Sequence, residues 1–525
     1  MLTKLNNICK KQFYFVWILL AALHWCVGNY CMKNFYAYRL WDVFVYPKWF
    51  ILRMTFFVIL CFCYYFLLWW IHNRNKVWIL FTVLYAVINL VLLLMVWPGI
   101  WRWDEFVIYV NALMQNMLYW QSYLTSLYYI FSIMFIPVVA APILTMIAIN
   151  SLIVGYVVEF AFKKWGKKGL LVFIPFLFFP VLDSNLYPMR VSICAFLELF
   201  LIVFLYQLYQ SSCITKRKVG ILLTVAAVIT VWRSESIYYI LIFPIVYILL
   251  LYKKLKFKQL ICSIMLYWSI TALLFIPQYL GNKADSSYNY DLTSVVLPLV
   301  PLVEAANQDQ DGIALNKIDQ VVNVDIILKG ISEGKTGIQL YWESAGFTRD
   351  YTSKQYKEFK KAYYSLILKY PGAFLKERFA CFVHSNGFVG NTTEIFDGAE
   401  VNWYQWFETV PGSKPINKEL RRKIISVLEW KNFTDYHHSK LGFGLIYNAI
   451  IPILFLLFVI LRLVGKKVYK EAAILFLTWI KVPLIFLTAP SRLFMYYYTV
   501  YLIGYVTFFM VVICLIGRKK NGKKL

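Results

Sequence analysis

Charged residues are scarce in this chain, and acidic residues are scarcer still. Only 15% of the 525 residues are charged, and 27 Asp and Glu stand against 53 Lys and Arg. Soluble domains carry about 25% charged residues, whereas this chain is 61% hydrophobic and 19% aromatic, with a mean hydropathy of +0.61. The composition excludes an ordinary soluble globular protein and indicates a protein embedded in a membrane.

The alternation of apolar and polar residues that marks a transmembrane β-barrel is also missing. Instead the apolar runs are about 17 to 25 residues long, which is enough to cross a hydrocarbon core as helices. We therefore expect an all-α polytopic membrane protein with about twelve transmembrane helices. The expected spans are 13–28, 50–71, 77–97, 138–162, 169–182, 187–209, 218–233, 237–252, 258–277, 441–461, 471–488 and 494–516.

Lysine and arginine gather in every second connection between these spans. The basic connections read "HNRNK", "KKWGKK", "TKRK", "KKLKFK", "RLVGKKVYK" and "GRKKNGKKL". Because positive residues are retained on the cytoplasmic side, this pattern predicts that both termini are cytoplasmic. The net charge of +26 then needs no nucleic-acid partner, since lysines facing anionic lipid explain much of it. The excess of lysine (39) over arginine (14) is typical of an AT-rich bacterial genome, so we expect a bacterial cytoplasmic membrane.

The same topology sends most polar segments to the outside and predicts three regions. Residues 1–277 form a transmembrane module of nine helices with a first large external loop at 98–137, residues 278–440 form a mainly helical extracytoplasmic domain, and residues 441–525 form a module of three helices. Of the ten cysteines, only Cys31 and Cys381 are expected outside, which excludes a disulfide framework, and no pair has metal-ligand spacing.

Two adjacent carboxylates, Asp104 and Glu105, stand in the external stretch "WPGIWRWDEF". Asp104 could serve as the N-cap of a surface helix over "DEFVIYVNALMQNMLYWQSYLTSLYY", with Glu105 favouring the positive helix end. Alternatively, one carboxylate faces a cavity at the outer membrane surface and acts as a general base on an acceptor hydroxyl. The sequence leaves both interpretations open.

Cations near the outer ends of the spans are candidates for binding phosphate, for which the arginine fork is well suited. They are Arg190, Arg233 with its neighbour Glu235, Lys481 and Arg492. Two of these sites have a structural alternative: Arg233 and Glu235 can pair in a tight hairpin, and Lys481 can extend its amine outward to the headgroups. Glu198, midway along a span, is a further intramembrane charge without an evident partner.

These features together resemble the GT-C superfamily of membrane glycosyltransferases. The resemblance rests on many spans, an acid in the first large external loop, a short helix after it, and the segments "VWRSESIYYILIF" and "KYPGAFLKERF". It implies transfer of a sugar from a polyprenyl-phosphate or polyprenyl-diphosphate carrier to a lipid, glycan or protein at the outer face. By that pattern Asp104 corresponds to the base and Glu105 to its neighbour. The hydrophilic domain lies between the ninth and tenth spans rather than at the C-terminus, which leaves the acceptor open.

Two other functions stay open alongside the glycosyltransferase. An O-antigen-type polysaccharide polymerase also has about a dozen spans and external arginines, but it needs two large external loops where this chain has one. A transporter or flippase of glycolipid predicts discontinuous helices and polar residues near the midplane. A divalent metal is compatible with the glycosyltransferase, and nothing in the sequence requires one.

Overall fold

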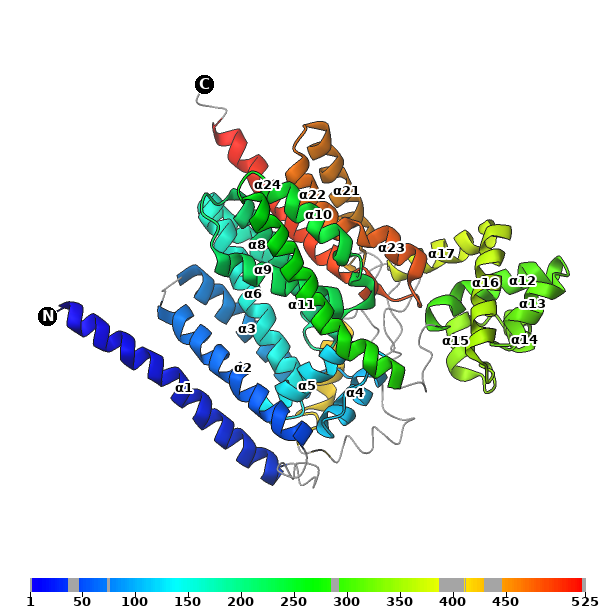
Figure 1. Cartoon of the computed structure of the whole chain (residues 1–525), viewed down its shortest axis with the longest axis horizontal. Helices are drawn as coiled ribbons and strands as arrows, with labels where there is room; N and C mark the ends of the chain where they lie inside the picture. The colour runs from blue at the N-terminus through cyan, green and yellow to red at the C-terminus, as the bar shows by residue number, and fades with distance from the viewer. Residues whose placement is uncertain are drawn as a thin grey trace.

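The computed structural model describes residues 2–35, 47–72, 76–284, 292–386, 410, 412–428 and 446–521. Over these ranges the fold is helical and contains no β-strand, apart from one isolated bridge between Val322 and Thr348. The all-α prediction is therefore confirmed. Figure 1 shows a bundle of long helices with a smaller helical domain at one side.

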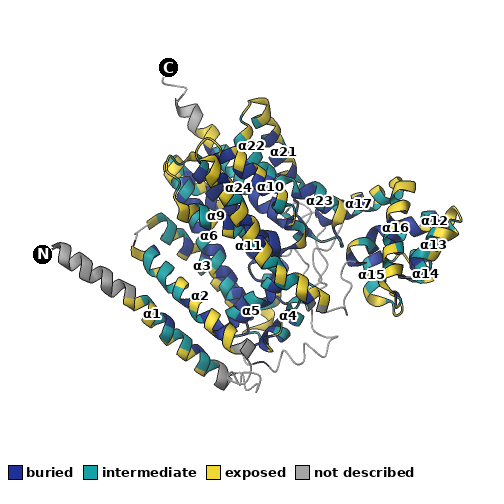
Figure 2. Ribbon diagram, viewed as in Figure 1, coloured by how far each residue is buried: buried dark blue, intermediate teal, exposed yellow. Residues whose placement is uncertain are grey.

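Eight helical segments within the described ranges are long and apolar enough to cross a membrane. They are Phe50–His72, Lys76–Met95, Ala141–Leu177, Arg190–Gln210, Ser234–Leu251, Phe257–Lys283, Tyr469–Thr488 and Tyr498–Ile516. Three shorter apolar helices are Phe15–Cys31, Tyr123–Phe135 and Ile450–Gly465. Large apolar side chains such as Phe62, Leu241 and Leu273 are about two-thirds exposed, as expected of helices whose outer faces meet lipid. Figure 2 shows exposed residues along the outer helices of the bundle, such as α2 and α11. By length and composition, these helices make the chain a membrane protein.

The bundle is built from helices that run between two ends. The helices that form its main body are α1 (Leu2–Phe35), α2 (Pro47–His72), α3 (Lys76–Met95), α6 (Ala141–Trp165), η2 (Gly166–Leu177), α8 (Arg190–Gln210), α9 (Lys216–Trp232), α10 (Tyr239–Leu251), α11 (Phe257–Ala284), α21 (Ile450–Gly465), α22 (Tyr469–Trp479), α23 (Lys481–Thr488) and α24 (Tyr498–Asn521). The helices in the connections are α4 (Trp103–Leu113), α5 (Tyr123–Phe135), α7 (Phe179–Ser184), η3 (Ser234–Ser236), α19 (Lys418–Leu428) and η5 (Phe494–Tyr496).

One end of the bundle collects the basic connections. Lys254 donates to the carbonyl of Ser211 (2.7 Å), and the Lys470 amine lies 5.0 Å from the Tyr252 ring centre. Lys254 comes from the connection after α10, and Lys470 lies in the first turn of α22. At the opposite end, Trp232 closes α9 and donates to the carbonyl of Arg190, the first residue of α8 (3.0 Å). The basic and the acid-bearing connections therefore occupy opposite ends, as the lysine pattern predicts.

Between α6 and α8 the chain reverses at Gly166 and returns as a 3-10 helix. Gly166 has a φ of +60°, a conformation that favours glycine. The returning η2 packs closely against α6, because a Cβ at Gly169 would lie 2.2 Å from the carbonyl oxygen of Ala161. A 3-10 helix rises about 2.0 Å per residue, so the 12 residues of η2 extend further than an α-helix of the same length. The predicted short span 169–182 corresponds to η2 and α7.

The predicted surface helix after Asp104 is wrong as a single element. It is divided into α4 and α5, with a turn in which Gln115 has a φ of 53°. The N-cap of α4 is Arg102, which leaves Asp104 and Glu105 in the first turn, so the N-cap interpretation of Asp104 is also wrong. The span predicted over 471–488 is likewise divided, into α22 and α23, at Ile480.

The smaller domain has its own hydrophobic core. It consists of α12 (Thr293–Gln308), α13 (Gly312–Asp319), α14 (Val324–Ser332), α15 (Gly337–Glu343), α16 (Ser353–Lys369) and the start of α17 (Pro371–Ser385). Capping boxes begin α15 and α16, at Thr336 with Gln339 and at Thr352 with Gln355. The second half of α17 leaves this core: Cys381 and Phe382 pack with the bundle. The helix α19 also packs with the bundle, through Ile425 and Leu428.

Candidate functional site

The turn before α4 is fixed against the connection between α7 and α8. The Ile100 N–H donates to the carbonyl of Leu186 (2.9 Å). Gly99 has a φ of +100°, and a Cβ there would lie 2.1 Å from the Ile143 side chain, so a larger residue cannot occupy this position without a shift. From outside, Arg421 donates to the carbonyl of Gly99 (3.2 Å). Three separate segments therefore hold the start of α4 in place.

Asp104 lies in the first turn of α4 and is half-buried. The Gln121 amide donates to its Oδ2 (3.3 Å), and Gln278 of α11 holds the backbone carbonyl of Gln121 (3.1 Å). Burial raises the pKa of Asp104 above its ordinary value, while the positive charges of Arg190 and Arg102 act against that rise. A carboxylate with two neighbouring guanidinium groups remains able to accept a proton.

Glu105 is the less stabilised carboxyl of the two. Its Oε2 is buried without a hydrogen-bond partner. Burial, and then the charge of Asp104, raise the pKa of Glu105 from 4.5 to about 7, against the opposing effect of Arg102 and Arg190. At neutral pH this carboxyl exchanges its proton, and the two acids titrate as a pair.

Glu105→Gln should remove a pH-dependent loss of stability. A folded-state pKa above the unfolded value means that the folded protein holds the proton more tightly, so stability is highest below about 4.5 and falls as the pH rises through about 7. The full loss of stability amounts to about 3 kcal/mol.

The apparent melting temperature in detergent at pH 5 and pH 8 measures this loss. The wild-type protein should melt lower at pH 8, the difference should shrink in Glu105→Gln, and Glu343→Gln at an exposed site should behave as wild type. An unchanged difference in Glu105→Gln would contradict the assignment.

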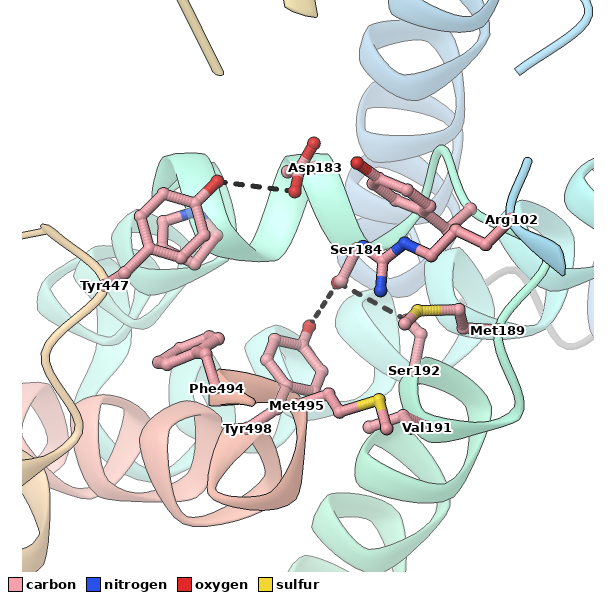
Figure 3. Close-up of a pocket in the computed structure, with 12 residues that line it drawn as sticks. Arg102, Asp183, Ser184, Met189, Val191, Ser192, Tyr447, Phe494, Met495 and Tyr498 are labelled. Atoms are coloured by element: carbon pink, nitrogen blue, oxygen red, sulfur yellow. Dashed lines mark hydrogen bonds between the residues drawn. The ribbon is translucent and has the colours of Figure 1, made fainter. Parts of the chain in front are cut away.

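A small pocket of about 40 Å³ is lined by Arg102, which precedes the acid pair by two residues, whereas neither Asp104 nor Glu105 is among its lining residues (Figure 3). A volume of this size holds a few water-sized groups and not a sugar ring. Its lining combines charged, hydroxyl and apolar side chains: Arg102, Pro180, Asp183, Ser184, Tyr187, Met189, Val191, Ser192, Tyr447, Phe494, Met495 and Tyr498. Arg102 stacks over the Tyr187 ring at 4.3 Å, and Tyr447 donates to Asp183 (3.3 Å).

Arg102 and Asp183 are pocket residues that the sequence reasoning did not select. Arg102 precedes the acid pair by two residues in "WRWDEF", and Asp183 lies seven residues before Arg190 in "LDSNLYPMR". Both stretches contain a conspicuous charged residue, but only the fold shows that Arg102 and Asp183 line the same pocket. Tyr447 and Tyr498 carry no local signal, because they reach the pocket from the C-terminal module.

An amide network positions the turn that follows α7, the helix that carries Asp183. The Asn185 amide nitrogen donates to the Tyr85 hydroxyl (2.8 Å) and to Asn89 (3.0 Å), and its oxygen accepts from Asn150 (2.8 Å) and Ser192 (3.2 Å). The bonds connect this turn to α3, α6 and α8. Since every hydrogen-bonding atom of the Asn185 amide is engaged inside the bundle, the turn has one defined position.

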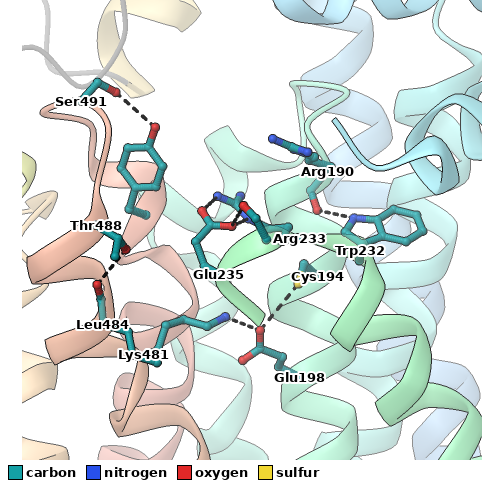
Figure 4. Close-up of polar contacts among 12 residues, drawn as sticks. Arg190, Cys194, Glu198, Trp232, Arg233, Glu235, Lys481, Leu484, Thr488 and Ser491 are labelled. Atoms are coloured by element: carbon teal, nitrogen blue, oxygen red, sulfur yellow. Dashed lines mark hydrogen bonds and ion pairs between the residues drawn. The ribbon is translucent and has the colours of Figure 1, made fainter. Parts of the chain in front are cut away.

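Arg233 and Glu235 form the ion pair that the sequence allowed. The Arg233 Nε donates to Glu235 Oε2 (3.1 Å), and its Nη2 pairs with Oε1, a two-pronged contact within one tight turn. Arg233 Nη1 is buried without a hydrogen-bond partner. Figure 4 shows this pair below Arg190, at the ends of α8 and α9. The pairing supports a structural role for both residues.

Lys481 and Arg492 lie outside the pocket lining, each with its own acidic partner. Lys481 forms a buried ion pair with Glu198 of α8, and the Cys194 thiol lies 3.6 Å from the same Glu198 oxygen (Figure 4). Arg492 pairs with Glu377 of α17 (2.8 Å). Glu198 thus has the partner that the sequence did not reveal. Snorkelling of Lys481 toward the headgroups is not observed, because its side chain is only 5% exposed.

No cluster of three or more histidine, cysteine or acidic side chains able to hold a metal ion occurs in the part of the chain that the structure describes. The nine cysteines described are all free thiols. His437 and His438, expected to be interfacial polar residues, lie outside the described ranges.

Comparison of the chain with protein-family models, curated proteins and solved structures found no match.

Proposed function

We propose that this chain is an integral membrane glycosyltransferase of the GT-C type. It would transfer a sugar from a polyprenyl-phosphate or polyprenyl-diphosphate carrier to a lipid or cell-envelope glycan acceptor, or to a protein, at the extracytoplasmic face of a bacterial cytoplasmic membrane. We further propose twelve crossings with both termini cytoplasmic, in which η2 with α7, and α22 with α23, each count as one crossing. This count takes α1, α9 and α21 with the eight long apolar segments, of which Ala141–Leu177 counts as two crossings, α6 and η2 with α7.

The observation that carries this proposal is the proximity of two acids to two arginines, one of which lines the pocket. Asp104 and Glu105 lie close enough to Arg102 and Arg190 for both cations to influence both carboxyls. Arg102 also lines the pocket, and Arg190 lies between its lining residues Met189 and Val191. A base beside a cationic anchor is what sugar transfer from a phosphate carrier requires.

The reaction would be an inverting displacement at the anomeric carbon. Asp104 takes the proton of the acceptor hydroxyl as its oxygen forms the new bond to that carbon. The bond between the anomeric carbon and the carrier phosphate breaks, and its electron pair leaves with the phosphate. Arg102 and Arg190 balance the charge that develops on the leaving oxygen. Because the pocket is too small for a sugar ring, it suits the phosphate or its waters, and the sugar would lie at its mouth beside Asp104.

Purified protein in detergent should consume a polyprenyl-linked sugar when an acceptor is supplied. Arg190→Gln should raise the KM for the donor about tenfold or more, since a phosphate contact of this strength contributes about 1.5–3 kcal/mol. Arg422→Gln, at an exposed arginine of α19, is the matched control and should leave KM unchanged. If the donor is not consumed with any lipid, glycan or protein acceptor, the glycosyltransferase proposal fails.

One observation favours a second candidate, a transporter or flippase of glycolipid. The eleventh predicted span has a single-residue turn at Ile480, whose backbone stays helical, and the next residue, Lys481, forms a buried pair with Glu198 inside the bundle. Ionisable residues paired inside a membrane bundle are typical of transport pathways. A transporter moves substrate only between two sealed compartments and consumes none in detergent, so the same assay separates the two functions.

A further inference from the structure

Four large apolar side chains of the smaller domain are exposed in a row across two consecutive helices. Tyr364 and Leu368 of α16 are 60% and 83% exposed, and Leu375 and Phe379 of α17 are 50% and 62% exposed. Each pair is spaced by four residues, which places its members on one helix face. We call these four residues the apolar row. A soluble surface rarely leaves so many large apolar groups together, so something is expected to cover them.

Leu375 and Phe379 belong to neither of the two hydrophobic cores. Phe374 packs into the core of the smaller domain, and Arg378 and Cys381 are buried, Cys381 in the core of the bundle. At 100° per residue, Leu375 and Phe379 lie about 100° and 140° around the helix from Phe374. Lys376 is exposed about 60° from Phe379. The helix therefore presents a third face, apolar with an adjacent cation.

The depth of α17 relative to the membrane is fixed by its contacts with α23. Arg378 is fully buried and donates to the carbonyls of Leu487 (3.4 Å) and Ala489 (2.8 Å). Those carbonyls are at the C-terminal end of the apolar segment Tyr469–Thr488, which is long enough to span a membrane. Phe379 follows Arg378 in the chain, so it lies at the level where that span ends. Leu487 is itself 48% exposed, which continues the apolar surface from the span.

We propose that the apolar row inserts into the outer leaflet of the membrane and that the smaller domain rests on the lipid surface beside the bundle. Figure 1 shows α17 leading sideways from the end of α23 to α16, so that the domain overhangs the area next to the bundle. Arg378 attaches α17 to the end of a span, and Phe379 and Leu487 are both exposed at that level, which selects lipid as the occupant of the row. Lys376 places its amine among the headgroups while its stem lies along the acyl boundary. This inference is independent of the proposed catalytic activity.

The test uses the full-length protein in nanodiscs of phosphatidylethanolamine and phosphatidylglycerol. A fluorescent amino acid sensitive to its environment replaces Leu375 or Phe379, one at a time. The same probe at Ile313 of α13 (78% exposed) or Trp342 of α15 (61% exposed) provides matched controls in the same domain. Lipids carrying a nitroxide near the headgroup act as quenchers.

Probes at 375 and 379 should be quenched at least about threefold more strongly by nitroxide lipid than probes at 313 and 342, with emission shifted to shorter wavelength. Equal quenching at all four positions would overturn the proposal. So would blue-shifted emission at 375 and 379 without lipid quenching, because that result means a protein surface or a second copy covers the row. Size-exclusion profiles check that each labelled protein is folded, and the exposure of all four positions makes the substitutions tolerable.

Discussion

Asp104→Asn is expected to lower the turnover of sugar transfer by about a hundredfold or more, with the KM for the donor nearly unchanged. General-base catalysis contributes about 10²- to 10⁴-fold, and asparagine cannot accept the proton. The substitution keeps the side-chain oxygen that accepts from Gln121, so the fold of α4 should persist. Steady-state kcat and KM in detergent, with the lipid-linked donor and a hydroxyl acceptor, measure the effect.

Glu105→Gln is the control beside it and should lower kcat much less. One carboxyl oxygen of Glu105 is buried without a hydrogen-bond partner. Because its pKa is raised to about 7, Glu105 is partly protonated at neutral pH. If Glu105→Gln abolished sugar transfer while Asp104→Asn kept full activity, Glu105 and not Asp104 would be the base. If both variants kept full activity, the acid pair would have no catalytic role and the proposed mechanism would be abandoned.

Lys481→Met should destabilise the protein by about 3–5 kcal/mol, because it leaves the fully buried Glu198 charge without its cation. Most of the protein should then fail to accumulate in the membrane in folded form. The double variant Lys481→Met, Glu198→Gln should recover much of the loss, since it removes both charges together. Fluorescence-detected size exclusion of solubilised membranes gives the folded yield.

The matched control for this pair is Lys423→Met. Lys423 pairs with Glu419 at 3.0 Å, and both side chains are exposed (57% and 71%), so its removal should change the yield little, as exposed pairs contribute about 0–1 kcal/mol. A stable Lys481→Met single variant with lost transport or transfer activity would show instead that the Lys481–Glu198 pair is functional rather than structural.

Helix positions in this fold follow from hydrophobic runs, and the sequence was a good guide to them. Each of the twelve predicted spans overlaps a helical segment of the structure, because a run of apolar residues long enough to cross hydrocarbon must satisfy its backbone as a helix. The internal breaks were less predictable. In "LTWIKVPLIF" the local signal for the turn at Ile480 is Pro483, which cannot donate to the carbonyl of Trp479. The prediction of one uninterrupted span did not use this signal. η2 forms a 3-10 helix where its pattern reads only as a short apolar run.

The candidate site shows the same division between local and distant information. Asp104 and Glu105 were found because a charged pair after an apolar run is conspicuous in one stretch of sequence. The Lys481–Glu198 contact joins residues 283 positions apart, and Tyr498 reaches Ser184 across 314 positions. Single-sequence patterns carry no information on which distant helices become neighbours, so these partners required the fold.

The hydrogen bond of 2.6 Å between Ser184 and Tyr498 has a consequence for synthesis of the chain. Tyr498 opens α24, while Ser184 is the final residue of α7, the helix that carries Asp183. A ribosome-bound intermediate that has inserted everything up to α11 already contains both acids and both arginines of the site, but it lacks the wall supplied by Tyr447, Phe494 and Tyr498. The emerging polypeptide would therefore hold an unfinished pocket during translation, and the site would close only when the final helix docks.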